Sequence, residues 1–153
     1  MKKFLIGFLL LACGPCWGFT QPKTQQLAFA IAKAEGFYLK GSIPNRCANP
    51  GDLKAFRNWK QPGQIGVCKG GHVRFRNNAA GWAALRHQID KIIDNTSGHY
   101  SVNMTIAQMG HKYAGNWRAW SRIVSHTLGV TPDTALWEIL DVPPILDKNR
   151  RKS

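Results

Sequence analysis

The stretch from Leu27 to Gly36 constrains this chain most, because an alanine-rich helical pattern there runs into a carboxylate and then a glycine. Leu27, Ile31 and Ala34 recur at helical spacing, which predicts one buried stripe. Glu35 borders that stripe, and Gly36 has the place of a glycine that ends a helix. We therefore expect a helix that carries Glu35 in its last turn, at the edge of the core.

The position of Glu35 predicts a raised pKa. The negative end of the helix dipole and the aromatic neighbours Phe37 and Tyr38 all disfavour a charged carboxylate. A carboxyl that stays protonated near neutral pH can protonate the leaving oxygen of a glycosidic bond. The alternative is a helix-end glutamate paired with Lys33 or Lys40 on a solvated surface, and this stretch alone favours that alternative.

The first residues predict export. A basic start at residues 1–3 precedes an apolar run, 4–12, that is too short for a stable membrane anchor. Small residues suit cleavage after Gly18, so we expect residues 1–18 to be a signal peptide and the mature protein to be periplasmic or secreted, without a transmembrane segment. A lipoprotein acylated at Cys13 is the alternative, but it would leave Cys16 unpaired.

Cleavage after Gly18 leaves Cys47 and Cys68 as one pair. An exported chain meets an oxidising compartment, so we expect a disulfide that closes the loop after the Glu35 helix, with two reduced buried thiols as the alternative. Such a bond stabilises a loop of this length by about 3 kcal/mol. The five histidines show none of the paired spacings of zinc sites, so we expect no metal and no cofactor.

The remaining helical patterns predict one mainly α domain at residues 19–140, followed by a basic, disordered tail at 141–153. Periodicity fails between residues 44 and 77, which predicts a loop with one hairpin that pairs residues 65–67 with 73–75. The later helices are expected after caps at Asn77, Asn103, Asn116 and Thr131, with stops at Gly98, Gly115, Gly129 and after Leu140.

The formal net charge is +13, and removal of Lys2 and Lys3 leaves 19 basic against 8 acidic residues, or +11. Such an excess favours anionic polymers of a bacterial envelope. The basic residues are dispersed and export removes the usual partner, so nucleic-acid binding is disfavoured.

Several short segments occur in an order that is more specific than any one of them. They are residues 30–37 (AIAKAEGF), 41–46 (GSIPNR), 49–53 (NPGDL), 80–85 (AGWAAL), 104–109 (MTIAQM), 112–114 (KYA) and 128–130 (LGV). Together, over roughly residues 25–140, they resemble a family of small secreted lysozyme-like proteins related to lytic transglycosylases.

The resemblance implies a lysozyme-like fold and cleavage of peptidoglycan glycan strands. It implies that Glu35 is the catalytic acid and that the phenol of Tyr113 belongs to the site. Gly115 stands where the family usually has proline. Asp52 stands where the family has asparagine, so it inherits no role.

Other residues are weaker candidates for the site. Asp52 is the candidate for a second carboxylate, although a role as a turn residue is favoured. The candidates for substrate contact are Tyr113, Asn49, Gln88 and Trp59. Trp59 can stack on a sugar or fill a gap under its loop, and Gln88 and Tyr113 can equally serve the core.

We therefore expect a monomeric exported enzyme, a lytic transglycosylase or muramidase, whose partner is peptidoglycan. Attack by water gives a reducing end, whereas attack by the muramoyl 6-hydroxyl gives an anhydro-sugar without a second carboxylate, and the resemblance favours the latter. The alternative is a non-catalytic cationic module that binds the cell wall or anionic envelope polymers, or a cationic protein that acts on bacteria by charge.

Overall fold

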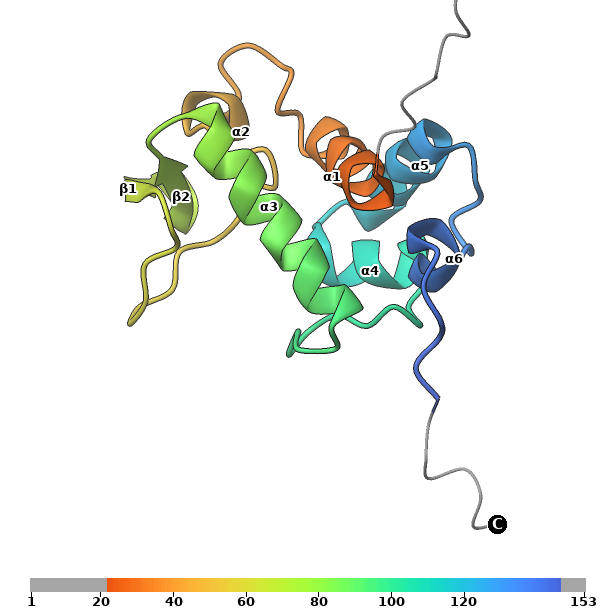
Figure 1. The fold of residues 1–153 in the computed structure, drawn as a ribbon. Coiled ribbons are helices and arrows are strands. Elements are labelled where there is room, and N and C mark those ends of the chain that lie inside the picture. Colours follow the sequence, from red (N-terminus) through yellow and green to blue (C-terminus); the bar gives the residue numbers. More distant parts are fainter. Residues whose placement is uncertain (1–21, 147–153) are drawn as a thin grey trace, which may run out of the picture.

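The computed structural model describes residues 22–146 of the 153-residue chain (Figure 1). The expected signal peptide and the alternative lipidation at Cys13 lie outside these residues. The described elements are α1 (Lys23–Ala34), α2 (Ile43–Arg46), β1 (Gln64–Cys68), the 3-10 turn η1 (Lys69–Gly71), β2 (His72–Phe75), α3 (Asn78–Ile93), α4 (Ile106–Tyr113), α5 (Trp117–Leu128) and α6 (Leu136–Leu140). The prediction of a mainly helical chain with a small hairpin is confirmed.

The core gathers around α1, which packs against α3, α5 and α6, while α4 packs against α5. Figure 1 shows α3 running from the hairpin side of the molecule to α4. The predicted stripe of α1 is buried, with Leu27 and Ile31 inaccessible to solvent. Opposite it lie buried aliphatic side chains from the other helices, including Leu85, Ile89, Ile106, Val124 and Leu136. Within the described residues, no helix has the length and apolar character needed to cross a membrane.

The hairpin and the disulfide form as predicted. Strands β1 and β2 pair antiparallel, and Val67 lies opposite Val73. Cys47 and Cys68 form the disulfide, which joins the end of α2 to the end of β1. Only one strand contributes to the interior, because Val73 is buried while Val67 is 55% exposed. The hairpin therefore covers the start of α3 with one face and presents its other strand to solvent.

The prediction of a loop between residues 44 and 77 was wrong at its start, where α2 forms. Ser42 caps this helix, since its hydroxyl accepts the Asn45 N–H, and Pro44 lies in the first turn. A helix of four residues is too short to show a hydrophobic period. Its turn leads directly to Cys47 and so fixes the start of the loop.

Three predicted helix boundaries were also wrong. Helix α3 ends at Ile93, because Asn95 already has a left-handed backbone with φ 55°. Helix α4 is capped by Thr105 in a capping box with Gln108, whereas Asn103 exchanges two hydrogen bonds with the backbone of Ile145. It ends where Ala114 turns extended, so Gly115 is not its stop.

Helix α6 begins at Leu136, later than the predicted cap at Thr131. Residues 131–134 form a turn, and Ala135 is extended because it bridges to Thr105. Part of the segment predicted as a tail is held to the fold: Val142 donates to the carbonyl of Trp137, and Ile145 exchanges two hydrogen bonds with Asn103. Residues 147–153 lie outside the described part of the chain.

Candidate active site

A cleft of about 560 Å³ opens between the end of α1, the segment 51–56, and helices α3 and α4. It brings together four predicted site residues, Glu35, Asp52, Gln88 and Tyr113. Further lining residues were not predicted. They include Lys54, Phe56, His72, His99, Tyr100 and Lys112.

Glu35 caps the C-terminus of α1, and Gly36 turns the chain away with φ 74°, as predicted. Its Oε1 accepts a hydrogen bond of 2.6 Å from Nε1 of Trp120, a buried residue of α5. Among the described residues Glu35 forms no ion pair, so the predicted alternative of a partner at Lys33 or Lys40 is not observed. The carboxyl lies against the core and not on a solvated surface.

Burial raises the pKa of Glu35 from 4.5 to about 7. The Trp120 hydrogen bond opposes this shift, the charge of Asp52 adds to it, and the charge of Lys54 opposes it. The upward shift of the pKa agrees with the sequence prediction, but the aromatic residue beside the carboxyl is not one of the two that were predicted, Phe37 and Tyr38. The ring of Phe37 packs against Trp82, whereas Trp120 reaches the carboxylate from 85 residues away.

Tyr113 joins the two sides of the cleft. Its hydroxyl donates a 2.6 Å hydrogen bond to the carbonyl of Gly51, and its ring stacks on Trp120 with centroids 5.1 Å apart. Burial raises the pKa of Tyr113 well above its usual value, so the hydroxyl stays a donor. Because this hydroxyl is bonded to the backbone of Gly51, Tyr113 holds the turn that carries Asp52.

Asn49 was predicted to contact substrate, and its surroundings contradict this. The residue is inaccessible to solvent, and its amide nitrogen donates to the carbonyls of Leu53 and Val73 at 2.9 and 3.0 Å. Its side-chain oxygen accepts the Leu53 N–H. Asn49 therefore shapes the turn beneath Asp52 from the inside.

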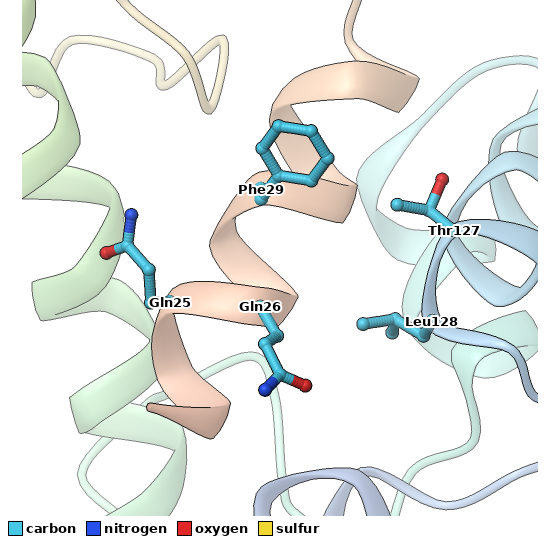
Figure 2. Close-up of a pocket in the computed structure, with 5 residues that line it drawn as sticks. All are labelled: Gln25, Gln26, Phe29, Thr127 and Leu128. Atoms are coloured by element: carbon cyan, nitrogen blue, oxygen red, sulfur yellow. The ribbon is translucent and has the colours of Figure 1, made fainter. Parts of the chain in front are cut away.

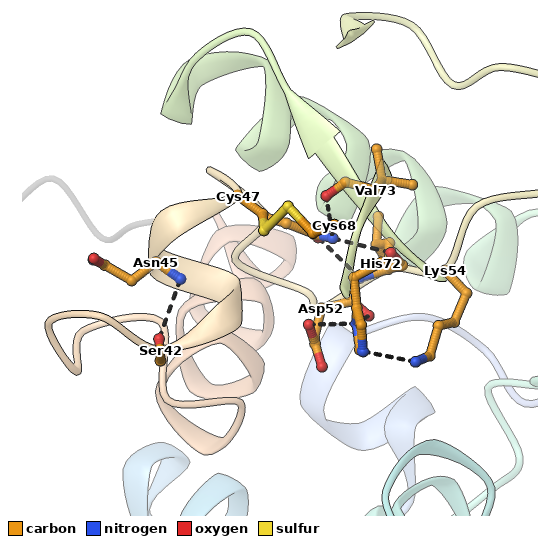
Figure 3. Close-up of a disulfide and its surroundings, with 10 residues drawn as sticks. Ser42, Asn45, Cys47, Asp52, Lys54, Cys68, His72 and Val73 are labelled. Carbon is orange, nitrogen blue, oxygen red and sulfur yellow. Dashed lines mark hydrogen bonds and ion pairs between the residues drawn. A yellow bond between two sulfur atoms is a disulfide. The ribbon is translucent and has the colours of Figure 1, made fainter. Parts of the chain in front are cut away.

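Asp52 lies on the loop side of the cleft, where its backbone is left-handed with φ 48°. Its Oδ1 is 2.6 Å from Nδ1 of His72, and Nε2 of the same ring is 2.7 Å from Nζ of Lys54 (Figure 3). Burial raises the pKa of Asp52, while His72 and Lys54 lower it. Lys54 and His72 belong to no sequence motif. They meet through an antiparallel bridge between residues 18 positions apart, so no local signal in the sequence indicates them.

Trp59 does not line this cleft. It is 48% exposed and lies in a hollow beside α3 with Pro62 and His87. The aromatic ring that this loop places at the cleft is Phe56, which packs against Trp59 with centroids 5.8 Å apart. Gln88, half-buried on α3, does line the cleft, as predicted.

A separate groove of about 480 Å³ runs between α1 and α5 (Figure 2). Figure 2 shows Thr127 and Leu128 of α5 facing Phe29 of α1 across it. None of its lining side chains is ionisable at neutral pH, so this groove offers no proton donor. The cleft around Glu35 is therefore the candidate active site.

Comparison with protein-family models, with curated proteins and with solved structures gives no match. Within residues 22–146, no group of three or more histidine, cysteine or acidic side chains could hold a metal ion.

Proposed function

We propose that this protein is an exported enzyme that cleaves the glycan strands of peptidoglycan, on a lysozyme-like fold, with Glu35 as general acid. One observation carries the proposal: a buried carboxyl with a pKa of about 7 lines an open cleft that a second carboxylate also lines. An acid works best when its pKa lies near the working pH. Glycosidases use such a carboxyl to protonate the leaving oxygen.

Glu35 donates its proton to the oxygen of the bond between two sugars as an oxocarbenium-like centre develops. The carboxylate left behind keeps the hydrogen bond from Trp120, which is strongest to the charged form. Trp120 thus supports the state that Glu35 must reach during the reaction. The acceptor that completes the cleavage is water or the muramoyl 6-hydroxyl.

The rest of the cleft suits a sugar polymer. Phe56 and Tyr100 offer apolar ring surface to a sugar face, and the amide of Gln88 can bond its hydroxyl or acetamido groups. Lys112 suits the carboxylates of the peptides that peptidoglycan carries. An uncharged glycan would make no use of this cation.

A cationic module that binds the envelope is the second candidate function. It is favoured by a basic surface on α1 and α5, where Lys33, Arg122 and His126 surround the exposed Ile123. Such a module has no need for a buried carboxyl in a cleft, and this is why the enzyme is the first candidate.

The test is digestion of purified peptidoglycan by the mature protein and by its Glu35→Gln variant, with released muropeptides identified by mass. The amide keeps an oxygen that can accept from Trp120 but has no acidic proton to transfer, so the rate of cleavage should fall by about 10²-fold or more. Asp90→Asn, which removes an exposed carboxylate of α3, is the matched control and should cleave normally. Wall binding without release by the wild type would contradict the enzyme and support the cationic module.

A further inference from the structure

We propose that Lys54 and His72 are positioning residues that hold Asp52 as the base for an attacking water, so that the enzyme hydrolyses its substrate. This inference rests on the proposed function and selects one of its two acceptors. It assigns roles to two side chains that the sequence did not single out.

Lys54, His72 and Asp52 follow one another in space, and the donors among them fix where the proton of the His72 ring lies. An ammonium group can only donate, so Nζ of Lys54 donates to Nε2 of His72 at 2.7 Å and to the carbonyl of Gly70 at 2.9 Å. The proton of the neutral ring is then on Nδ1, which donates to the backbone carbonyl of Asp52 at 3.1 Å and lies 2.6 Å from Oδ1 of the same residue. Burial raises the pKa of Asp52, and His72 and Lys54 oppose this rise and so support the ionised form that a base needs.

Two backbone hydrogen bonds fix the segment that follows Asp52. Val73 donates to the carbonyl of Leu53 at 2.8 Å, and Ala55 donates to that of Gly71 at 2.9 Å, which joins the segment to η1 and β2. The Cys47–Cys68 disulfide closes the same loop. Asp52 is therefore held in place before any substrate binds, as a base that works by position needs to be.

One carboxylate oxygen remains for chemistry. Oδ1 of Asp52 is buried against His72, whereas the side chain as a whole is 21% exposed and lines the cleft. Figure 3 shows the second oxygen pointing away from His72. Asp52 is close enough to Glu35 for its charge to raise the pKa of Glu35 across the cleft.

The step balances without another reactant. Glu35 gives its proton to the glycosidic oxygen, and the bond from that oxygen to the anomeric carbon breaks with both electrons on the oxygen. A water oxygen bonds to the anomeric carbon, and its proton passes to Asp52. Asp52 then loses this proton to solvent and Glu35 regains one. Attack by the muramoyl 6-hydroxyl would need only Glu35, and the hydrogen-bonded side chains of Lys54, His72 and Asp52 would then have no role in the reaction.

The first test identifies the products. Digestion of peptidoglycan by the wild type should release fragments that have gained the mass of one water, and Asp52→Asn should lower kcat by about 10²-fold or more. Anhydro-sugar ends would overturn the inference while leaving the proposed function intact, as would an Asp52→Asn variant of normal rate. Cleavage that survives Glu35→Gln would instead overturn the proposed function.

The second test separates positioning from mere structural support through the pH profile of kcat/KM. The titratable and charged groups of the cleft are Glu35, Asp52, Lys54, His72, His99, Tyr100, Lys112 and Tyr113. Lys54 lowers the pKa of both carboxyl groups, so Lys54→Met should move the acidic and basic limbs to higher pH together. Asp52 raises the pKa of Glu35, so Asp52→Asn should remove the acidic limb and lower the basic one.

His72 has a conservative variant. His72→Ala should lower kcat/KM about 10-fold, and His72→Asn should recover part of the loss because its amide can still donate to Asp52. Lys69→Met removes an exposed lysine two residues from Gly71 and should leave the profile unchanged. Loss of thermal stability in Lys54→Met and His72→Ala with both pH limbs in place would assign these residues a structural role and overturn the inference.

Discussion

The two sides of the cleft hold one carboxyl group each, in opposite surroundings. On the helical side Glu35 ends α1 against buried aromatic side chains, with one hydrogen-bond donor from Trp120. On the loop side Asp52 lies in a turn closed by a disulfide, beside His72 and close to Lys54. Burial raises the pKa of both carboxyl groups, to about 7 for Glu35, and beside Asp52 the charges of His72 and Lys54 oppose that rise.

The largest expected effect on stability comes from removing the buried acid of the helical side. The folded pKa of Glu35, about 7, lies above the ordinary 4.5, so folding favours its proton and stability falls as pH rises from about 4.5 to 7. Glu35→Gln should therefore be more stable than the wild type at pH 8, by up to about 3 kcal/mol, and equal to it near pH 4. Urea unfolding at the two pH values measures this difference.

Asp52→Asn is the matched variant of the loop side. Burial raises the pKa of Asp52 as well, but His72 and Lys54 oppose this rise, so its gain in stability at pH 8 should be smaller than that of Glu35→Gln. Equal gains from both variants would mean that the two sides treat their carboxyl groups alike.

Trp120→Phe should have the next largest effect, because it keeps a ring and removes the donor to Glu35. The Trp120 hydrogen bond lowers the pKa of Glu35, so its loss should raise that pKa further above 7. The variant should lose about 2 kcal/mol of stability at pH 8 and less at pH 5, where Glu35 is protonated in both proteins. Thermal unfolding at the two pH values and the basic limb of the activity profile check this.

Trp82→Phe is the control for that experiment. Trp82 is half-buried and packs on Phe37, and no hydrogen bond of its ring nitrogen is described. Its loss of stability should be the same at both pH values. A pH-independent loss in Trp120→Phe as well would show that packing, and not the hydrogen bond, is what Trp120 contributes.

The two sides also differ in how far the sequence predicts them. The helical side follows from local signals: the spacing of Leu27 and Ile31, then Glu35, then a glycine with positive φ. The disulfide and hairpin of the loop side follow from cysteine parity and alternation as well. These features depend on neighbours within a few residues or on a count.

The sequence does not reveal which distant side chains contact one another around the cleft. Trp120 reaches Glu35 over 85 residues, and His72 reaches Asp52 over 20, through packing that no local period encodes. Asn49 was misassigned for the same reason, because a buried amide and an exposed one look alike in sequence. Trp59 was misassigned because only the path of its loop decides that Phe56 lines the cleft.

The smallest effect concerns the bond that joins the two sides. Tyr113→Phe removes the hydroxyl that donates to Gly51 and leaves the stacked ring in place, so stability should fall by about 1 kcal/mol. Tyr100→Phe removes a hydroxyl from the same cleft for which no hydrogen bond is described, and it should cost less. If the bond sets the position of Asp52 relative to Glu35, Tyr113→Phe lowers kcat with little change in KM. An unchanged kcat at reduced stability would mean that the disulfide and β2 alone hold the loop side in register with the helices.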